Sequence, residues 1–210
     1  MKRVYILLAD GFEAVEAIAP IDVMNRAGVD VVRVAVGSSL EVTSSHDLVT
    51  LRCDLLLGDA DFTDGDALIL PGGNPGYLNL RSSERVCRVV GDYYASGRVV
   101  AAICGAPTVL ATAGVARGSR ITCHSTVVDQ MGDYEYVGGA VVEDDNLINY
   151  FGWAPTLDGV VLTEQPYLAA PQRSRNIPLL IGTNKHEATP SFYDVGFSSL
   201  DERGQDSLVI

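Results

Sequence analysis

Apolar runs alternate with amphipathic segments through about residue 149 of this chain. The apolar runs are short and rich in Val, Ile and Leu, as in strands that are buried on both faces. Between them, apolar residues recur at helical spacing, and a glycine follows each such segment as a stop signal. The expected strands are 4–8, 31–36, 67–70, 99–103 and 147–148, and the expected helices are 14–27, 82–96 and 106–113, stopped by Gly28, Gly97 and Gly114.

Strands that alternate with helices predict an α/β fold with a doubly wound parallel sheet and right-handed crossovers. Residues 41–52 are expected to form a small hairpin around Ser44-Ser45-His46-Asp47. The pattern changes near residues 149–152: five of the nine prolines follow this point, helical periodicity fades, and one clear apolar strand remains at 178–182. We therefore expect two regions, residues 1–149 and an atypical extension over residues 150–210.

Length and charge narrow the classes of function. A chain of 210 residues can bury one substantial core, and a hydrophobic fraction of 47% suits a buried sheet. The net charge of −12 argues against binding a nucleic acid backbone or an anionic membrane surface, both of which require clustered Lys and Arg. Small neutral or cationic ligands remain compatible with this charge.

The N-terminus has a basic start and a short apolar run, but Asp10 interrupts that run and no cleavage site follows. It is therefore interpreted as a first strand rather than a signal peptide. No apolar stretch reaches transmembrane length, and the four cysteines show neither a zinc pattern nor the spacing of a disulfide framework. These features predict a cytoplasmic protein that needs no metal.

Cys104 stands where an apolar strand, 99–103, runs into a glycine and an expected helix start. Such a turn places the thiol at the carboxyl edge of the sheet, where open α/β folds bind ligands. Unpaired N–H groups and the positive end of the helix dipole favour thiolate over thiol there. Cys53, Cys87 and Cys123 are interpreted as small buried hydrophobes.

Three more candidate residues follow other predicted strands: Glu16 opens the first helix, Gly73 ends a Leu-Pro-Gly-Gly turn, and His124 follows the apolar Ile121. A carboxyl, an imidazole and backbone N–H groups around a thiol suit nucleophilic attack on a carbonyl. Cys104 would attack, the N–H groups of Gly73 and Gly105 would receive the oxyanion, and Glu16 and His124 would move protons. A buried Glu16 would tend to keep its proton beside a thiolate.

Each of these residues also has a purely structural interpretation. Glu16 could complement the helix dipole, Gly72 and Gly73 could form only a turn, and His124 could be a hydrogen-bonded core residue. Their positions at successive strand ends of one sheet favour a shared site over three unrelated structural roles.

Four motifs together resemble the ThiJ/PfpI superfamily, also called the DJ-one family: Glu16-Ala-Ile-Ala-Pro20, Leu70-Pro-Gly-Gly73, Ala101-Ala-Ile-Cys-Gly-Ala-Pro107 and Thr122-Cys-His124. The resemblance covers roughly residues 1–149. It implies a flavodoxin-like three-layer sandwich related to class I glutamine amidotransferases, usually dimeric. It also implies that Cys104 is the nucleophile, Glu16 its partner, Gly73 the oxyanion glycine and His124 the nearby histidine.

The resemblance implies a cofactor-independent glyoxalase or deglycase that acts on a small carbonyl substrate such as methylglyoxal. The alternatives that it leaves open are an oxidative-stress sensor or chaperone that uses Cys104 oxidation, and an inactive relic. The protease branch typically carries histidine directly after the cysteine. Gly105 occupies that position here, which argues against a Cys-His protease.

Residues 151–193 resemble instead a fragment of type B carboxylesterases, in which Glu187 matches the acid of the catalytic triad. The chain has no Gly-x-Ser-x-Gly motif, so ester hydrolysis is not expected. The junction indicates a spliced chain, by natural recombination, an error in gene prediction or deliberate fusion. Because the family's last helix is missing, we expect the extension to cover one apolar face of the sheet.

Overall fold

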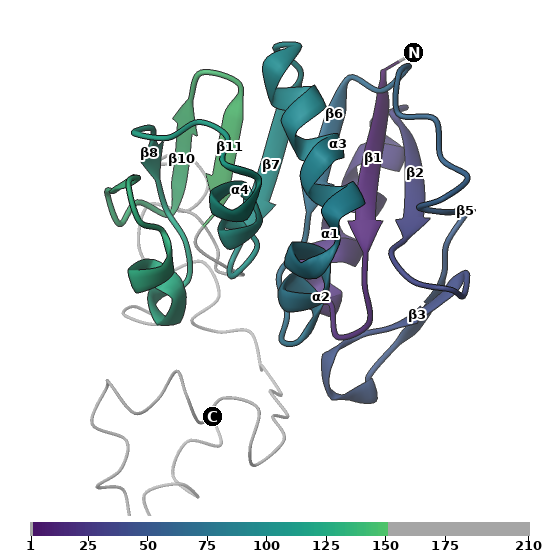
Figure 1. The fold of residues 1–210 in the computed structure, drawn as a ribbon. Helices are drawn as coiled ribbons and strands as arrows, with labels where there is room; N and C mark the ends of the chain where they lie inside the picture. The colour runs from purple at the N-terminus through teal and green to yellow at the C-terminus, as the bar shows by residue number, and fades with distance from the viewer. Residues whose placement is uncertain (1, 151–210) are drawn as a thin grey trace, which may run out of the picture. The chain divides into compact units, whose positions relative to one another are not determined.

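The fold is taken from a computed structural model, which describes residues 2–150. Its main element is a seven-stranded sheet in the order β10-β11-β7-β6-β1-β2-β5 (Figure 1). All neighbouring strands run parallel except β10 and β11. The strands are β1 (Arg3–Leu8), β2 (Asp30–Ala35), β5 (Leu55–Leu56), β6 (Ala67–Leu70), β7 (Val99–Ile103), β10 (Val141–Asp144) and β11 (Leu147–Tyr150).

The strand order reverses direction beside β1. From β1 the chain builds outward through β2 to β5, and it then returns to β6 on the other side of β1 and continues to β7 and β11. The carboxyl ends of β1 and β6 therefore diverge, and such a switch point is where doubly wound sheets bind ligands. The loops that leave β1, β6 and β7 meet at this edge.

Helices cover both faces of the sheet. Helix α1 (Ala14–Arg26) packs on one face, against Ile6 and Leu8 of β1. Helices α2 (Gly76–Ser82), α3 (Glu84–Ala95) and α4 (Pro107–Ala113) pack on the other, larger core (Figure 1). The three layers confirm the predicted flavodoxin-like sandwich.

Local sequence explains how the helices beside the site begin and end. The Ser83 hydroxyl accepts a hydrogen bond from the Val86 N–H and caps α3. Pro107 occupies the first turn of α4, where its missing N–H costs nothing, and Gly114 ends that helix in the left-handed region at φ 69°. Leu110 of α4 is fully buried, which stabilises the fold by about 1.5–3 kcal/mol relative to an exposed side chain.

The predicted hairpin forms from β3 (Glu41–Thr43) and β4 (Thr50–Arg52). It supports the loop after β1, because the Gly11 N–H donates to the Thr43 carbonyl at 2.7 Å and the Ser45 N–H donates to the Phe12 carbonyl at 2.7 Å. The hairpin thus fixes the segment that leads into α1 and its acidic residues.

The five predicted strands and three predicted helices are confirmed to within a few residues. The sequence patterns missed α2, β5, β10, the strands β8 (Arg120–Ile121) and β9 (Glu135–Tyr136), and the 3-10 turns η1 (Ser45–Asp47) and η2 (Ser125–Gln130). These elements are short, and β8 and β9 pair only with each other. The predictions for residues 151–210, including Glu187 and the cover over the sheet, lie outside the described residues.

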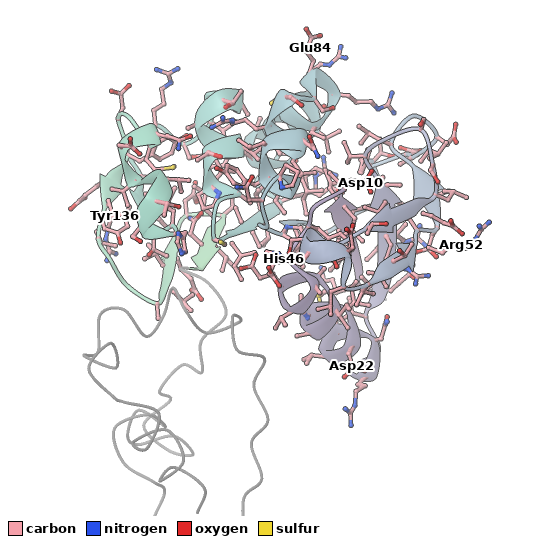
Figure 2. All side chains as sticks on the ribbon, turned by 90° about the horizontal axis from the view of Figure 1, so that it is seen from below. Asp10, Asp22, His46, Arg52, Glu84 and Tyr136 are labelled. Carbon is pink, nitrogen blue, oxygen red and sulfur yellow. The ribbon has the colours of Figure 1, made fainter. Side chains whose placement is uncertain are left out.

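The charged side chains of Asp22, Arg52 and Glu84 are exposed and point outward in Figure 2. In the part of the chain that the structure describes, no helix is both long and apolar enough to cross a membrane.

Candidate active site

Cys104 follows the last residue of β7 in a sharp turn. Its φ of 62° lies in the left-handed region, which is unusual for a residue with a side chain and is typical of strained functional turns. Two hydrogen bonds hold the turn: the Ala106 N–H donates to the Ile103 carbonyl at 2.9 Å, and the His124 N–H donates to the Cys104 carbonyl at 2.8 Å. The thiol is half-buried at the carboxyl edge of the sheet, as predicted.

Glu16 lies on the first turn of α1 and is only 3% exposed. Its Oε2 accepts a hydrogen bond from the Gly72 N–H at 2.8 Å. Within residues 2–150, Oε1 accepts no hydrogen bond of ordinary geometry, although the carboxyl is close enough to Cys104 for their titrations to be linked. A role in complementing the helix dipole does not by itself account for the burial of Glu16, because an exposed carboxylate on the first turn would interact with the dipole equally well.

Gly72 lies between the Glu16 carboxyl and the Cys104 side chain. A Cβ at this position would lie 2.7 Å from the Cys104 Cβ and 2.7 Å from the Glu16 Oε2, so only glycine leaves room for both side chains. The sequence pattern treated Gly72 only as part of a turn. Its actual contribution is to let an acid on α1 approach a thiol that follows β7.

Burial controls the electrostatics of this pair. The pKa of Glu16 is raised from 4.5 to about 7, mainly because the carboxyl is buried. The Gly72 N–H lowers this pKa, and the nearby charge of Glu13 raises it. Burial also raises the pKa of Cys104 to about 12, with the ionised Glu16 as the second cause. The backbone N–H groups favour the thiolate, as expected, but desolvation of the thiol outweighs them.

The pair therefore titrates as a unit, and loss of the Cys104 proton is coupled to its gain by Glu16. A carboxyl with a pKa near 7 is well placed to accept a proton at neutral pH.

Two backbone N–H groups point at the Cys104 sulfur, those of Gly73 and Gly105, and both lower the pKa of the thiol. Gly73 adopts a φ of 89°, and a Cβ there would collide with the Glu13 nitrogen and the Gly11 carbonyl. Glycine is therefore required at position 73 by both conformation and space. Two N–H donors therefore converge on the thiol, an arrangement that can stabilise a developing oxyanion.

His124 lies directly before η2, and its backbone is bonded to Cys104. Its Nδ1 is 2.9 Å from the Thr126 hydroxyl and accepts from the Thr126 N–H at 3.3 Å. An acceptor at Nδ1 places the proton of the neutral ring on Nε2. In this tautomer His124 can donate a hydrogen bond through Nε2.

Two neighbours of the site were not singled out from the sequence. Glu13 precedes α1, and the Ser45 hydroxyl donates to its Oε2 at 3.0 Å. Tyr77 of α2 packs its ring against Gly105. The positions of Glu13 and Tyr77 at the site depend on contacts between segments that are far apart in the chain, and no local sequence pattern reveals such contacts.

Among residues 2–150, no cluster of three or more His, Cys, Asp or Glu side chains could hold a metal ion.

Comparisons with known proteins agree on one family. The chain is 37% identical over 155 residues to the Parkinson disease protein 7 homolog of Danio rerio, covering 72% of this chain and 82% of that one. It is 34% identical over 157 residues to protein DJ-1 homolog B of Arabidopsis thaliana, covering 74% of this chain but 36% of the plant protein. A protein named deglycase TK1284 from Thermococcus kodakarensis is 33% identical over 149 residues, covering 70% of this chain and 88% of that one.

Among solved structures, a variant of the DJ-1 superfamily protein STM1931 from Salmonella typhimurium matches with a TM-score of 0.69 and 36% identity. It covers 72% of this chain and 82% of the Salmonella chain. Residues 2–153 match the DJ-1/PfpI family as a whole. The match, the fold and the site at the switch point together show that this chain is a member of the DJ-1/PfpI family.

Proposed function

We propose that this protein is a cysteine-dependent glyoxalase or deglycase that acts on methylglyoxal and related α-oxoaldehydes or their adducts. The observation that carries the proposal is the buried Cys104–Glu16 pair beneath two converging N–H donors. The deglycase name of the archaeal relative supports the same class of substrate.

In the first step, Glu16 accepts the Cys104 proton while the sulfur adds to the aldehyde carbon of methylglyoxal. The new C–S bond converts the carbonyl oxygen into an oxyanion, which the N–H groups of Gly73 and Gly105 stabilise. Glu16 then passes the proton that it took from Cys104 to this oxygen, which leaves a hemithioacetal on Cys104 and an ionised Glu16. The electron pair comes from sulfur, so no external oxidant is needed.

Conversion to lactate is an internal redox reaction. A base removes the hydrogen from the sulfur-bearing carbon, and the electrons shift to the neighbouring carbonyl, whose oxygen takes up a proton to give an enediol. The hydroxyl on the sulfur-bearing carbon then loses its proton as the second carbon gains one, which leaves the thioester of lactate on Cys104. Ionised Glu16 is the base nearest the sulfur, and the Nε2–H of His124 is a proton donor beside the turn. Water then hydrolyses the thioester to lactate and returns Cys104 to its thiol form.

Every group in this sequence of steps comes from the chain itself, so the proposal requires no cofactor. It also differs from the chemistry of the protease branch, because Gly105 offers no imidazole next to the nucleophile. Carboxylesterase activity is not proposed, since Glu187 has no nucleophilic serine motif to serve.

The test is lactate formation from methylglyoxal by the wild type, by Cys104→Ser and by Cys87→Ser. Cys87 lies on α3 and is half-buried like Cys104, so it provides a matched control for loss of a thiol. We expect Cys104→Ser to lose essentially all activity while Cys87→Ser retains it. Full activity in Cys104→Ser would refute the proposal, and an inactive but folded wild type would favour the relic interpretation.

Oxidation of Cys104 without turnover is the second candidate function. The Gly73 and Gly105 N–H groups and a protonated Glu16 could hydrogen-bond the oxygens of a sulfinic acid as well as an oxyanion. Mass spectrometry after mild peroxide treatment tests this. Sulfinic acid confined to Cys104 would support a sensor, and uniform oxidation of the four cysteines would contradict it.

We also propose that the protein works as a cytoplasmic homodimer. Support for self-association comes from α1, where Val15, Ile18 and Val23 are exposed apolar side chains. Light scattering coupled to size-exclusion chromatography tests the dimer, and a monomer at all concentrations would refute it.

A further inference from the structure

Tyr77 contacts both glycines that supply the oxyanion hole. Its backbone N–H donates to the Gly73 carbonyl at 2.9 Å, at the start of α2. Its ring lies against Gly105: a Cβ on Gly105 would be 2.7 Å from the Tyr77 Cδ1, 2.9 Å from Cγ and 3.0 Å from Cε1. These three ring atoms are the nearest neighbours of that position.

This packing explains why residue 105 is a glycine. Gly105 is buried and its φ lies outside the left-handed region, so its conformation does not require glycine. The tyrosine ring instead fills the space that a side chain at 105 would occupy. Tyr77 and Gly105 are therefore complementary in size: the large tyrosine ring packs closely because residue 105 has no side chain.

The Tyr77 ring has a second neighbour, the Arg81 side chain of its own helix. The Arg81 guanidinium lies 5.9 Å from the Tyr77 ring centroid, and its Nη1 donates to the Gln130 Oε1 at 2.7 Å. Gln130 ends η2, the segment that His124 begins. The ring thus lies against the Cys104 turn and beside Arg81, which is itself bonded to η2. The Tyr77 hydroxyl has no hydrogen-bond partner among residues 2–150.

We propose that Tyr77 is a positioning residue: its ring holds the Gly105 backbone so that the Gly105 N–H points at the Cys104 sulfur and at the developing oxyanion. This role rests on the proposed function, since it acts through the oxyanion hole of that reaction. Glycine is the most flexible residue in a chain, so Gly105 needs an external support to keep its N–H aligned. Complete loss of one oxyanion donor typically costs about 10²–10³ in kcat, and a displaced donor costs part of that.

The first comparison is between Tyr77→Phe and Tyr77→Ala. Because the ring and not the hydroxyl makes the contacts, Tyr77→Phe should match the wild type. Tyr77→Ala should lower kcat for methylglyoxal about 10-fold with little change in KM, since the donor acts on the transition state more than on the substrate. Measured kcat and KM separate this from a loss of binding.

The second readout does not depend on turnover. The Gly105 N–H lowers the pKa of Cys104, so a misplaced N–H should raise it. The rate of Cys104 alkylation by iodoacetamide, followed by mass spectrometry from about pH 6 to about pH 10, should therefore fall at each pH in Tyr77→Ala. If the wild type forms no lactate at all, this measurement still decides the role of Tyr77.

A rescue variant completes the test. In Tyr77→Ala/Gly105→Ala, the added methyl enters the vacated space and restricts the backbone at 105, so both kcat and the alkylation rate should recover in part. Gly105→Ala alone should lose activity because its methyl meets the ring. An unchanged alkylation profile and kcat in Tyr77→Ala, or a double variant no better than Tyr77→Ala, would overturn the proposal. If Tyr77→Ala does not fold, Tyr77→Leu replaces it in the same comparisons.

Discussion

Replacing Glu16 with glutamine keeps the shape of the side chain and removes its ability to ionise. The amide oxygen of the new side chain can still accept the hydrogen bond from the Gly72 N–H, which lies 2.8 Å from Oε2 in the wild type. The substitution should therefore leave the fold in place while it changes how the free energy of unfolding depends on pH.

The magnitude follows from the raised pKa. A rise from 4.5 to about 7 corresponds to about 3 kcal/mol, at about 1.4 kcal/mol for each pKa unit. Below pH 4.5 the carboxyl is protonated in both states and costs nothing. As the pH rises from 4.5 to 7, the unfolded chain releases this proton and the folded protein keeps it, so the wild type loses about 3 kcal/mol of stability. Glu16→Gln does not have this loss.

The assay is urea denaturation of both proteins at several pH values between about 4.5 and about 8. Surface carboxyls such as Asp54 and Asp64 have lowered pKa values and are present in both proteins. The difference in unfolding free energy between the wild type and the variant therefore reports the contribution of Glu16 alone. We expect the variant to gain stability relative to the wild type as the pH rises, while kcat/KM for methylglyoxal falls by about 10²–10⁴ through loss of the general base. A stability difference that stays constant from pH 4.5 to 7 would refute the claim that burial holds Glu16 protonated.

Three further outcomes are expected. Gly73→Ala should destabilise the fold and abolish activity, because its φ is 89° and the methyl would meet the Glu13 nitrogen; a denaturation midpoint equal to that of the wild type would contradict this. Thr126→Val removes the hydroxyl 2.9 Å from the His124 Nδ1, and we expect a loss of about 2–10-fold in kcat/KM with an altered pH profile; an identical profile would show that this contact does not orient the ring. Leu110→Ala should cost about 2–5 kcal/mol of unfolding free energy without a change in Cys104 alkylation, as measured in urea at about pH 7.

The sequence was sufficient to predict the strand, turn and helix around Cys104 because each has a local signal. Strand 99–103 is an unbroken apolar run, Pro107 starts the helix and Gly114 ends it. The place of Glu16 near Cys104 was also predictable, since parallel strands bring their carboxyl ends to one edge of the sheet.

The details that decide the chemistry were not predictable from local patterns. The raised pKa of Cys104 comes mainly from burial of the thiol and next from the charge of Glu16, and that burial is a property of the whole fold. The contact between Tyr77 and Gly105 joins segments that are far apart in the chain. Helix α2 was missed because seven residues carry too little periodicity to stand out.

The linked titration of Cys104 and Glu16 also affects how product leaves. From about pH 7 up to about pH 12, Cys104 and Glu16 together hold one proton. The site therefore carries one negative charge, whichever of the two residues holds that proton. Methylglyoxal is neutral and lactate is an anion, so this charge repels the product but not the substrate. Below about pH 7 the pair becomes neutral and the repulsion disappears. Inhibition by added lactate should therefore be weak at about pH 8 and stronger at about pH 6.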